Sequence, residues 1–297
     1  MMEWLEKLLT ARGIYFDRDG NRIRCFPHVI NIAVKTGVKY MTGDNHNEAE
    51  ATKEQVHEDV RQVSTHDDLE YARILNNDPI GKVRTLSNWF RTSGQRRDIL
   101  KAVIMQGNAI LRSKRAEATA SPPPPLSHSS AIPPSPTPAP DVQGEASDDE
   151  PIFTEFLALV VLLRDVDTRW SSMYLMILRL LELYPAVNYV LHDPKHAKDR
   201  HLLLRRKELV VLKDITTFLK LFHKTQELLS ANRTPTLAYA IPAYELLLEG
   251  LDAMKQGFPG LQHAIIASER KLIEYLSLCR RSRLYSLAMG AFVFSSY

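Results

Sequence analysis

Two aspartates separated by one residue, Asp165 and Asp167, are the closest approach in this sequence to a catalytic carboxylate pair. On a β-strand, residues i and i+2 share a face, so these two side chains would together hold divalent metal ions. The residues that follow, Thr168 to Trp170, instead favour the start of a helix, where an acidic residue is stabilised by the positive helix end. We therefore expect helix capping here and no metal-ion catalysis.

Cys25 and His28 have the spacing of half a zinc site. A tetrahedral zinc site needs four ligands, and the chain has no second pair of this kind to complete one. The other candidate ligands lack a regular spacing; they are His46, His57 and His66 in an acidic segment and His192, His196 and His201 in a basic one. No glycine-rich phosphate loop, nucleophile elbow or dinucleotide fingerprint is present. The residues themselves predict no enzyme, resident metal, cofactor or small-molecule substrate.

Charge is distributed unevenly along the chain, although the net charge is only +3. Residues 44–70 contain nine acids and two bases and are expected to form a solvated loop. Residues 82–115 contain nine bases and one acid, interleaved with apolar residues, and are therefore expected to fold. This basic stretch either follows a phosphate backbone or simply faces water, and the sequence leaves both readings open.

Apolar residues at helical spacing predict that most of the chain is helical. The stripes cover residues 4–9, 29–38, 173–184, 209–229, 244–254 and 271–289. We expect the third to end at Pro185 and the last to break near Ser282. One β-hairpin is predicted over residues 14–25, where apolar and polar residues alternate around Asp19 and Gly20. The expected fold class is mainly α, with few β-strands.

A segment rich in proline and serine divides the sequence. Nine of the 17 prolines lie between Pro122 and Pro140, and an acidic run, Asp148 to Glu150, follows them. Such a composition buries too little apolar surface to fold, so residues 114–150 are predicted to be a disordered linker between folded parts at 1–113 and 151–297. The longest uninterrupted apolar run is eight residues, so no membrane span is expected. The chain has only two cysteines and begins with charged, helix-patterned sequence, so an intracellular location is expected.

Four segments, in order, resemble transposases of the hAT superfamily. Residues 22–32 are similar to the family's Cys-x-x-His-x-x-Asn segment, and residues 163–177 to its segment around Thr-Arg-Trp. Residues 233–237 and 270–276 match later positions. The resemblance implies an RNase H-like α/β core with an all-helical insertion, which residues 1–113 and 151–297 would share, and a nuclear location.

The same resemblance implies that this chain lacks catalytic activity. Family members hold divalent metal such as Mg²⁺ with three acidic residues, and the resemblance places these before Met1 and beyond the last helix. Asp165 and Asp167 align with non-catalytic positions. DNA contact is the function that would remain. The candidate contact residues are His28, Arg169 and Trp170 from the family pattern and Arg91, Arg96 and Arg97 from the basic stretch. The alternative for two of them is that Trp170 packs in the core and Arg169 pairs with an acid.

Three functional hypotheses follow. The leading one is a catalytically inactive, transposon-derived fragment that retains DNA binding, with DNA, a second copy or a related transposase chain as partner. The second is part of an active transposase whose acidic residues are supplied elsewhere. The third is a helical module that binds protein through its apolar stripes and proline-rich tether.

Overall fold

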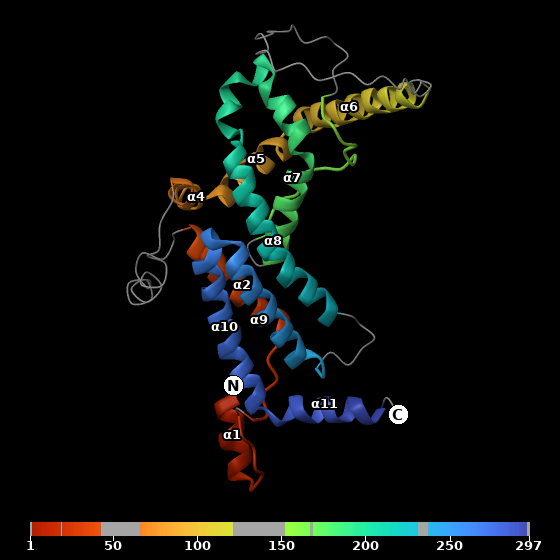
Figure 1. Ribbon diagram of the computed structural model, residues 1–297. Coiled ribbons are helices and arrows are strands. Elements are labelled where there is room, and N and C mark those ends of the chain that lie inside the picture. Colours follow the sequence, from red (N-terminus) through yellow and green to blue (C-terminus); the bar gives the residue numbers. More distant parts are fainter. Residues whose placement is uncertain are drawn as a thin grey trace, which may run out of the picture. The chain divides into compact units, whose positions relative to one another are not determined.

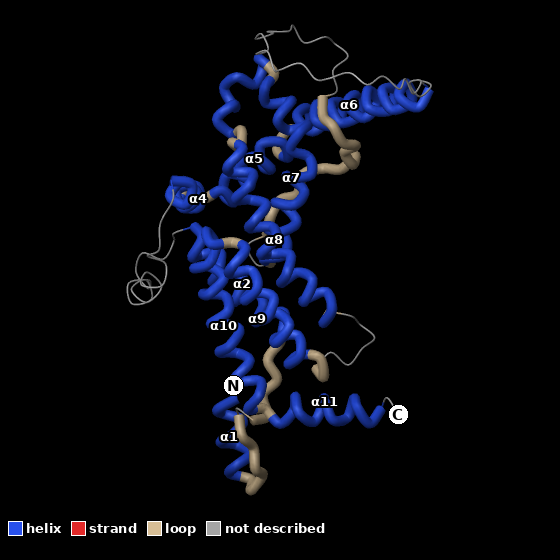
Figure 2. The backbone as a smooth tube through the Cα atoms, in the orientation of Figure 1, coloured by secondary structure: helices blue, strands red, loops and turns tan. Residues whose placement is uncertain are grey.

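The structure is a computed structural model that describes residues 2–18, 20–42, 66–120, 152–166, 169–230 and 237–295. Within these ranges every regular element is a helix, as Figure 2 shows, which confirms a mainly α fold. The helices of the N-terminal half are α1 (Met2–Ala11), α2 (Phe26–Thr42), α4 (His66–Asn76), α5 (Pro79–Arg91) and α6 (Gly94–Ala120). Those of the C-terminal half are α7 (Trp170–His192), η1 (Pro194–Leu202), α8 (Arg206–Leu229), α9 (Ala240–Gly257), η2 (Pro259–Leu261), α10 (Gln262–Arg281) and α11 (Arg283–Ser295).

The chain folds into two compact units, each assembled from separate stretches of sequence. The first contains residues 1–87, 163–181 and 204–297, and the second contains residues 88–162 and 182–203. Each unit thus takes residues from both sides of the predicted linker. Residues 114–120, assigned to that linker from composition, belong to α6, and the remainder of it lies outside the described residues.

In the first unit, α2, α8, α9 and α10 pack against one another to form the core (Figure 1). α2 packs into this core through its predicted apolar stripe, of which Val29, Ile30, Ala33 and Val34 are all buried. A glycine brings α2 close to α10. A Cβ added at Gly37 would lie 2.3 Å from the side-chain oxygen of a serine on α10, so only glycine fits there without displacement.

The second unit is held together where an extended segment crosses α6. The ring of Phe153 lies against Gly107, where an added Cβ would be 2.1 Å from the ring. The side chain of Asn108 accepts a hydrogen bond from the backbone N–H of Leu157 (3.0 Å) and donates one to its carbonyl (2.8 Å). The backbone N–H and carbonyl of Leu157 are therefore hydrogen-bonded to a side chain instead of to a partner strand.

The predicted hairpin over residues 14–25 is wrong. The Arg24 N–H donates to the Tyr285 hydroxyl (3.0 Å), which in turn donates to the Arg24 carbonyl (3.1 Å). The Gly20 carbonyl accepts hydrogen bonds from Ser282 Oγ (3.0 Å) and from the Arg283 N–H (3.2 Å). Backbone groups that a strand ladder would use are thus satisfied by the start of α11, and no β-ladder forms.

The expectation that a helix ends at Pro185 is also wrong, because α7 continues to His192. Pro185 is exposed, whereas Ala186 and Val187 immediately after it are buried. Burial of this apolar face outweighs the single backbone hydrogen bond that a proline removes. The predicted break near Ser282 is confirmed, since α10 ends at Arg281 and α11 begins at Arg283.

Among the described helices, α7 alone is long and apolar enough to cross a membrane. Its most apolar window is 56 % buried inside the protein, as is typical of a core helix. Length and composition are therefore weak evidence for a membrane span here.

Candidate nucleic-acid interface

Four basic residues follow one face of α6: Arg97, Lys101, Arg112 and Arg115. At about 100° per residue, their spacings of four, eleven and three positions place all four within an arc of about 60°. With a rise of about 1.5 Å per residue, the row extends along about 27 Å of the helix. All four side chains are exposed. We refer to these four residues as the α6 stripe.

Three of the four bases of the α6 stripe form no ion pair within the part of the chain that the structure describes. These are Arg97, Lys101 and Arg112. The guanidinium carbon of Arg115 lies 5.8 Å from the centroid of the Phe156 ring. α6 as a whole carries six bases and two acids. Bases of the first unit are different, because many of them pair with carboxylates. The positive potential along α6 therefore remains available to an external anion.

Two of the arginines predicted to contact DNA from the basic stretch are used internally. Arg96 lies 4.0 Å above the ring of Trp89 and donates a hydrogen bond to the Trp89 carbonyl (2.9 Å). Arg91 donates to the carbonyl of Leu162 (2.7 Å). Of the three, Arg97 alone is exposed and belongs to the α6 stripe. The prediction omitted Lys101, Arg112 and Arg115 as site residues, although their helical spacing from Arg97 was the signal that links them.

The three residues predicted from the family pattern lie in the first unit. His28 is exposed in the first turn of α2, and Arg169 is exposed immediately before α7. Trp170 is only 4 % exposed; its ring packs against Phe222 (6.3 Å between centroids) and its Nε1 donates to Gln226 (3.2 Å). A buried indole has no open face for a base, so the expected stacking by Trp170 does not agree with its position. The six predicted residues divide equally between the two units.

The carboxylate of Asp165 is bound within the protein. Arg84 donates to it through Nη2 (2.6 Å) and through Nε (2.9 and 3.1 Å). The side chain of Asp165 is 9 % exposed and that of Arg84 is 40 % exposed, so this is a partly buried, bidentate ion pair. Asp167, the second member of the sequence pair, lies outside the described residues. Asp165 therefore forms an ion pair that links α5 to the segment before α7.

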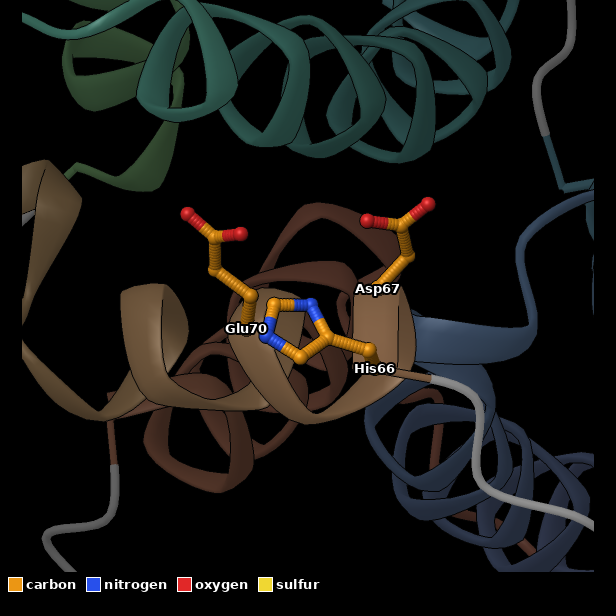
Figure 3. Close-up of side chains that lie close together, drawn as sticks. All are labelled: His66, Asp67 and Glu70. Carbon is orange, nitrogen blue, oxygen red and sulfur yellow. The ribbon is translucent and has the colours of Figure 1, made fainter.

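A histidine and two acids gather at the start of α4, in a segment that was expected to be a loop. The ligand atoms of His66, Asp67 and Glu70 lie within 4.8 Å of one another. Figure 3 shows both carboxylates extending to the same side of α4, with the imidazole between them in this view. The ammonium of Lys207 is 3.1 Å from Asp67 and also contacts Glu70, and these hydrogen bonds, Glu70 first, raise the pKa of Lys207. This lysine already contacts both carboxylates, so we assign the cluster as an ion-pair network.

Comparison of the chain with protein-family models, with curated proteins and with solved structures found no match in any of the three.

Proposed function

We propose that this protein binds DNA without sequence preference and without catalysis, through the α6 stripe. The observation that carries the proposal is the row of exposed bases on one helix face, three of which form no ion pair with any other described residue. Lysine and arginine side chains in such a row contact phosphate oxygens, which carry no sequence information.

The dimensions of the stripe fit a phosphate backbone. Duplex DNA carries one negative charge per about 1.7 Å of its axis, so a row of about 27 Å lies opposite many phosphates. Side chains that read bases need a bidentate amide or guanidinium placed at a base edge. The three arginines of the stripe are separated along α6 by Lys101 and by other residues. This arrangement favours neutralisation of phosphate charge over recognition of individual bases.

A transposon-derived origin and a nuclear location remain part of the proposal. They rest on the four segments that resemble hAT transposases, as does the RNase H-like core. The absence of catalysis is supported at Asp165, whose carboxylate is held by Arg84.

A titration of labelled duplex DNA tests the α6 stripe. The triple variant Arg97→Gln, Lys101→Gln, Arg112→Gln should weaken binding uniformly for two unrelated duplexes, measured by fluorescence anisotropy. The slope of log affinity against log salt should fall by about 2.7, because each lost phosphate contact contributes about 0.9.

A matched control removes three bases from the first unit. Lys213, Lys220 and Arg270 are exposed and form no ion pair with any described residue, so their glutamine variants change the net charge equally. The control should retain the affinity and salt slope of the unmodified protein. Equal losses in both variants would reduce the effect to net charge alone, and affinity that does not change with salt would overturn the proposal.

A protein-binding function is the second candidate, favoured by one observation on α1. This amphipathic helix buries none of its residues, and Trp4 is 65 % exposed. Exposed tryptophans are enriched at protein interfaces. Affinity capture in the presence of nuclease distinguishes this function, because partners bound through α1 persist after nuclease treatment and are lost in Trp4→Ala.

A further inference from the structure

The first unit contains a pocket of about 230 Å³ that α6 does not line. We propose that this pocket binds the phosphate group of a phosphate monoester, a function beyond the DNA binding proposed above. Its lining residues come from α2, α5 and the segment leading into α7; they are Lys35, Val38, Lys39, Thr42, Asp78, Ile80, Arg84, Asp165, Val166, Arg169, Trp170 and Met173.

One face of α2 forms a wall of the pocket. Lys35, Val38, Lys39 and Thr42 are spaced by three, one and three residues, which places them on a single helix face. The two lysines are exposed. The ammonium of Lys39 forms no ion pair with another described residue, so its charge is available at the pocket.

Arg169 lines the pocket, and hydrogen bonds hold its backbone. Its N–H donates to the Val166 carbonyl (2.8 Å), and Ser172 Oγ donates to the Arg169 carbonyl (2.6 Å). Ser172 Oγ also accepts from the Val166 N–H (2.7 Å). The backbone of Arg169 is therefore held in place, while its exposed guanidinium makes no ion pair within the described residues. Such preorganisation lowers the entropy lost when an anion binds.

The two acids that line the pocket are engaged by other groups. Asp165 is held by Arg84 through three hydrogen bonds. Asp78 accepts the Gly81 N–H (2.8 Å) at the start of α5, which ties its carboxylate to the helix it precedes. Arg84 is engaged by Asp165, while Asp78 keeps its charge opposite the lysines of α2. Lys39 and Arg169 are the lining cations that we expect to bind an incoming anion.

Charge and size select the ligand class. A phosphate monoester carries a charge of about −1.5 to −2 near neutral pH, which two cations match better than the single charge of a backbone diester. Pockets for drug-sized ligands span about 300–1,000 Å³, so this smaller one suits a single phosphate group with a short attachment. Val38, Ile80 and Met173 supply apolar surface for that attachment.

Isothermal titration calorimetry of the full chain with inorganic phosphate tests the proposal. Unmodified protein should bind phosphate, and the double variant Lys39→Gln, Arg169→Gln should bind at least about tenfold more weakly, because each cation removed loses a charge-assisted hydrogen bond. The conservative double variant Lys39→Arg, Arg169→Lys should retain binding. Lys220→Gln, Arg270→Gln is the matched control and should behave as the unmodified protein.

Further titrations distinguish the source of the phosphate. A nucleoside monophosphate and an oligonucleotide with a terminal phosphate both present a monoester, and either should compete with inorganic phosphate at the pocket. An oligonucleotide without a terminal phosphate should not. Competition by the unphosphorylated oligonucleotide, no binding of inorganic phosphate, or equal affinity in the glutamine double variant at unchanged melting temperature would each overturn the proposal.

The pocket and the α6 stripe can fail separately. The triple α6 variant should lose duplex affinity and keep phosphate binding. The double variant Lys39→Gln, Arg169→Gln should lose phosphate binding and keep its duplex affinity. That result would support the pocket even if the α6 stripe proved not to bind DNA.

Discussion

Arg84, Arg96 and Arg169 carry the same side chain in different surroundings. Arg84 is bound to Asp165, and Arg96 is stacked on Trp89. Arg169 is exposed beside a pocket and makes no ion pair within the described residues. A guanidinium that is already paired or stacked has little to gain from an external phosphate, so these contacts separate structural arginines from candidate binding ones.

At the scale of single residues, His263 should make the free energy of unfolding depend on pH. Burial lowers the pKa of this imidazole below its ordinary 6.5, against the opposing effect of its hydrogen bond with the Tyr40 carbonyl. As the pH falls through 6.5, the unfolded chain takes up a proton at His263 that the native protein does not. The free energy of unfolding should therefore fall on acidification and level off above that pH, as measured by urea titration across the range.

His263→Gln isolates this contribution, because glutamine keeps a donor for the Tyr40 carbonyl but does not titrate. The difference in unfolding free energy between the variant and the unmodified protein should change with pH below 6.5 and stay constant above it. A difference that is constant throughout would show that His263 does not titrate differently on folding.

At the scale of elements, the segment between α1 and α2 depends on α11 for its shape. The Tyr285 hydroxyl bonds both the N–H and the carbonyl of Arg24, and Ser282 and Arg283 bond the carbonyl of Gly20. Burial raises the pKa of Tyr285 to about 12, so the hydroxyl stays protonated and able to donate at neutral pH. The break between α10 and α11 is what brings these donors to the segment.

Removing one oxygen tests this dependence. Tyr285→Phe leaves the backbone N–H and carbonyl of Arg24 without their partner, and should lower the free energy of unfolding by about 1–3 kcal/mol. Hydrogen exchange at the Arg24 amide should accelerate as well. Both effects are accessible to denaturant titration and exchange-detected mass spectrometry.

Tyr275→Phe on α10 is the corresponding control, since no described hydrogen bond involves its hydroxyl, and it should change stability little. Unchanged exchange at Arg24 in Tyr285→Phe would mean that residues 14–25 hold their conformation without α11.

At the scale of the whole molecule, two separate sets of residues offer positive charge. The α6 stripe belongs to the second unit, and the pocket with Lys39 and Arg169 belongs to the first. The stripe consists of two pairs of bases along a helix, Arg97 with Lys101 and Arg112 with Arg115, and the segment at Leu157 crosses α6 between the pairs, at Asn108. Such a row suits a polymer, whereas the small pocket suits one group. We therefore expect the stripe to bind the phosphates of duplex DNA and the pocket to bind a single phosphate group.

Combining the variants tests the independence of these two sites. A protein with both Lys39→Gln, Arg169→Gln and the triple α6 change should show the sum of the two separate losses, expressed as free energies of duplex and phosphate binding. Additivity is expected because the sites share no residue. A combined loss that departs clearly from the sum, in either titration, would show that the sites are coupled.

The sequence by itself determined the distribution of charge and the helices that carry a regular apolar stripe, among them α2, α8 and α9, but not α4, which lies in a segment expected to be a loop. Apolar spacing located α2 and the break at Ser282, because a helix that packs on one side needs that period wherever it lies in the chain. Composition alone indicated that the basic stretch would fold. These properties depend on residues close in sequence, and local physics is sufficient to establish them.

Only the tertiary structure decided which groups are engaged. Alternating residues near Gly20 resembled a hairpin, but their backbone partners lie at the break between α10 and α11 and in the first turn of α11, far along the chain. For Trp170 the sequence left DNA contact and core packing open, and the ring is packed in the core. Asp165 was expected to cap a helix and is instead paired with Arg84. Burial and pairing depend on neighbours brought together by folding, and for that reason residue type and spacing along the chain did not specify them.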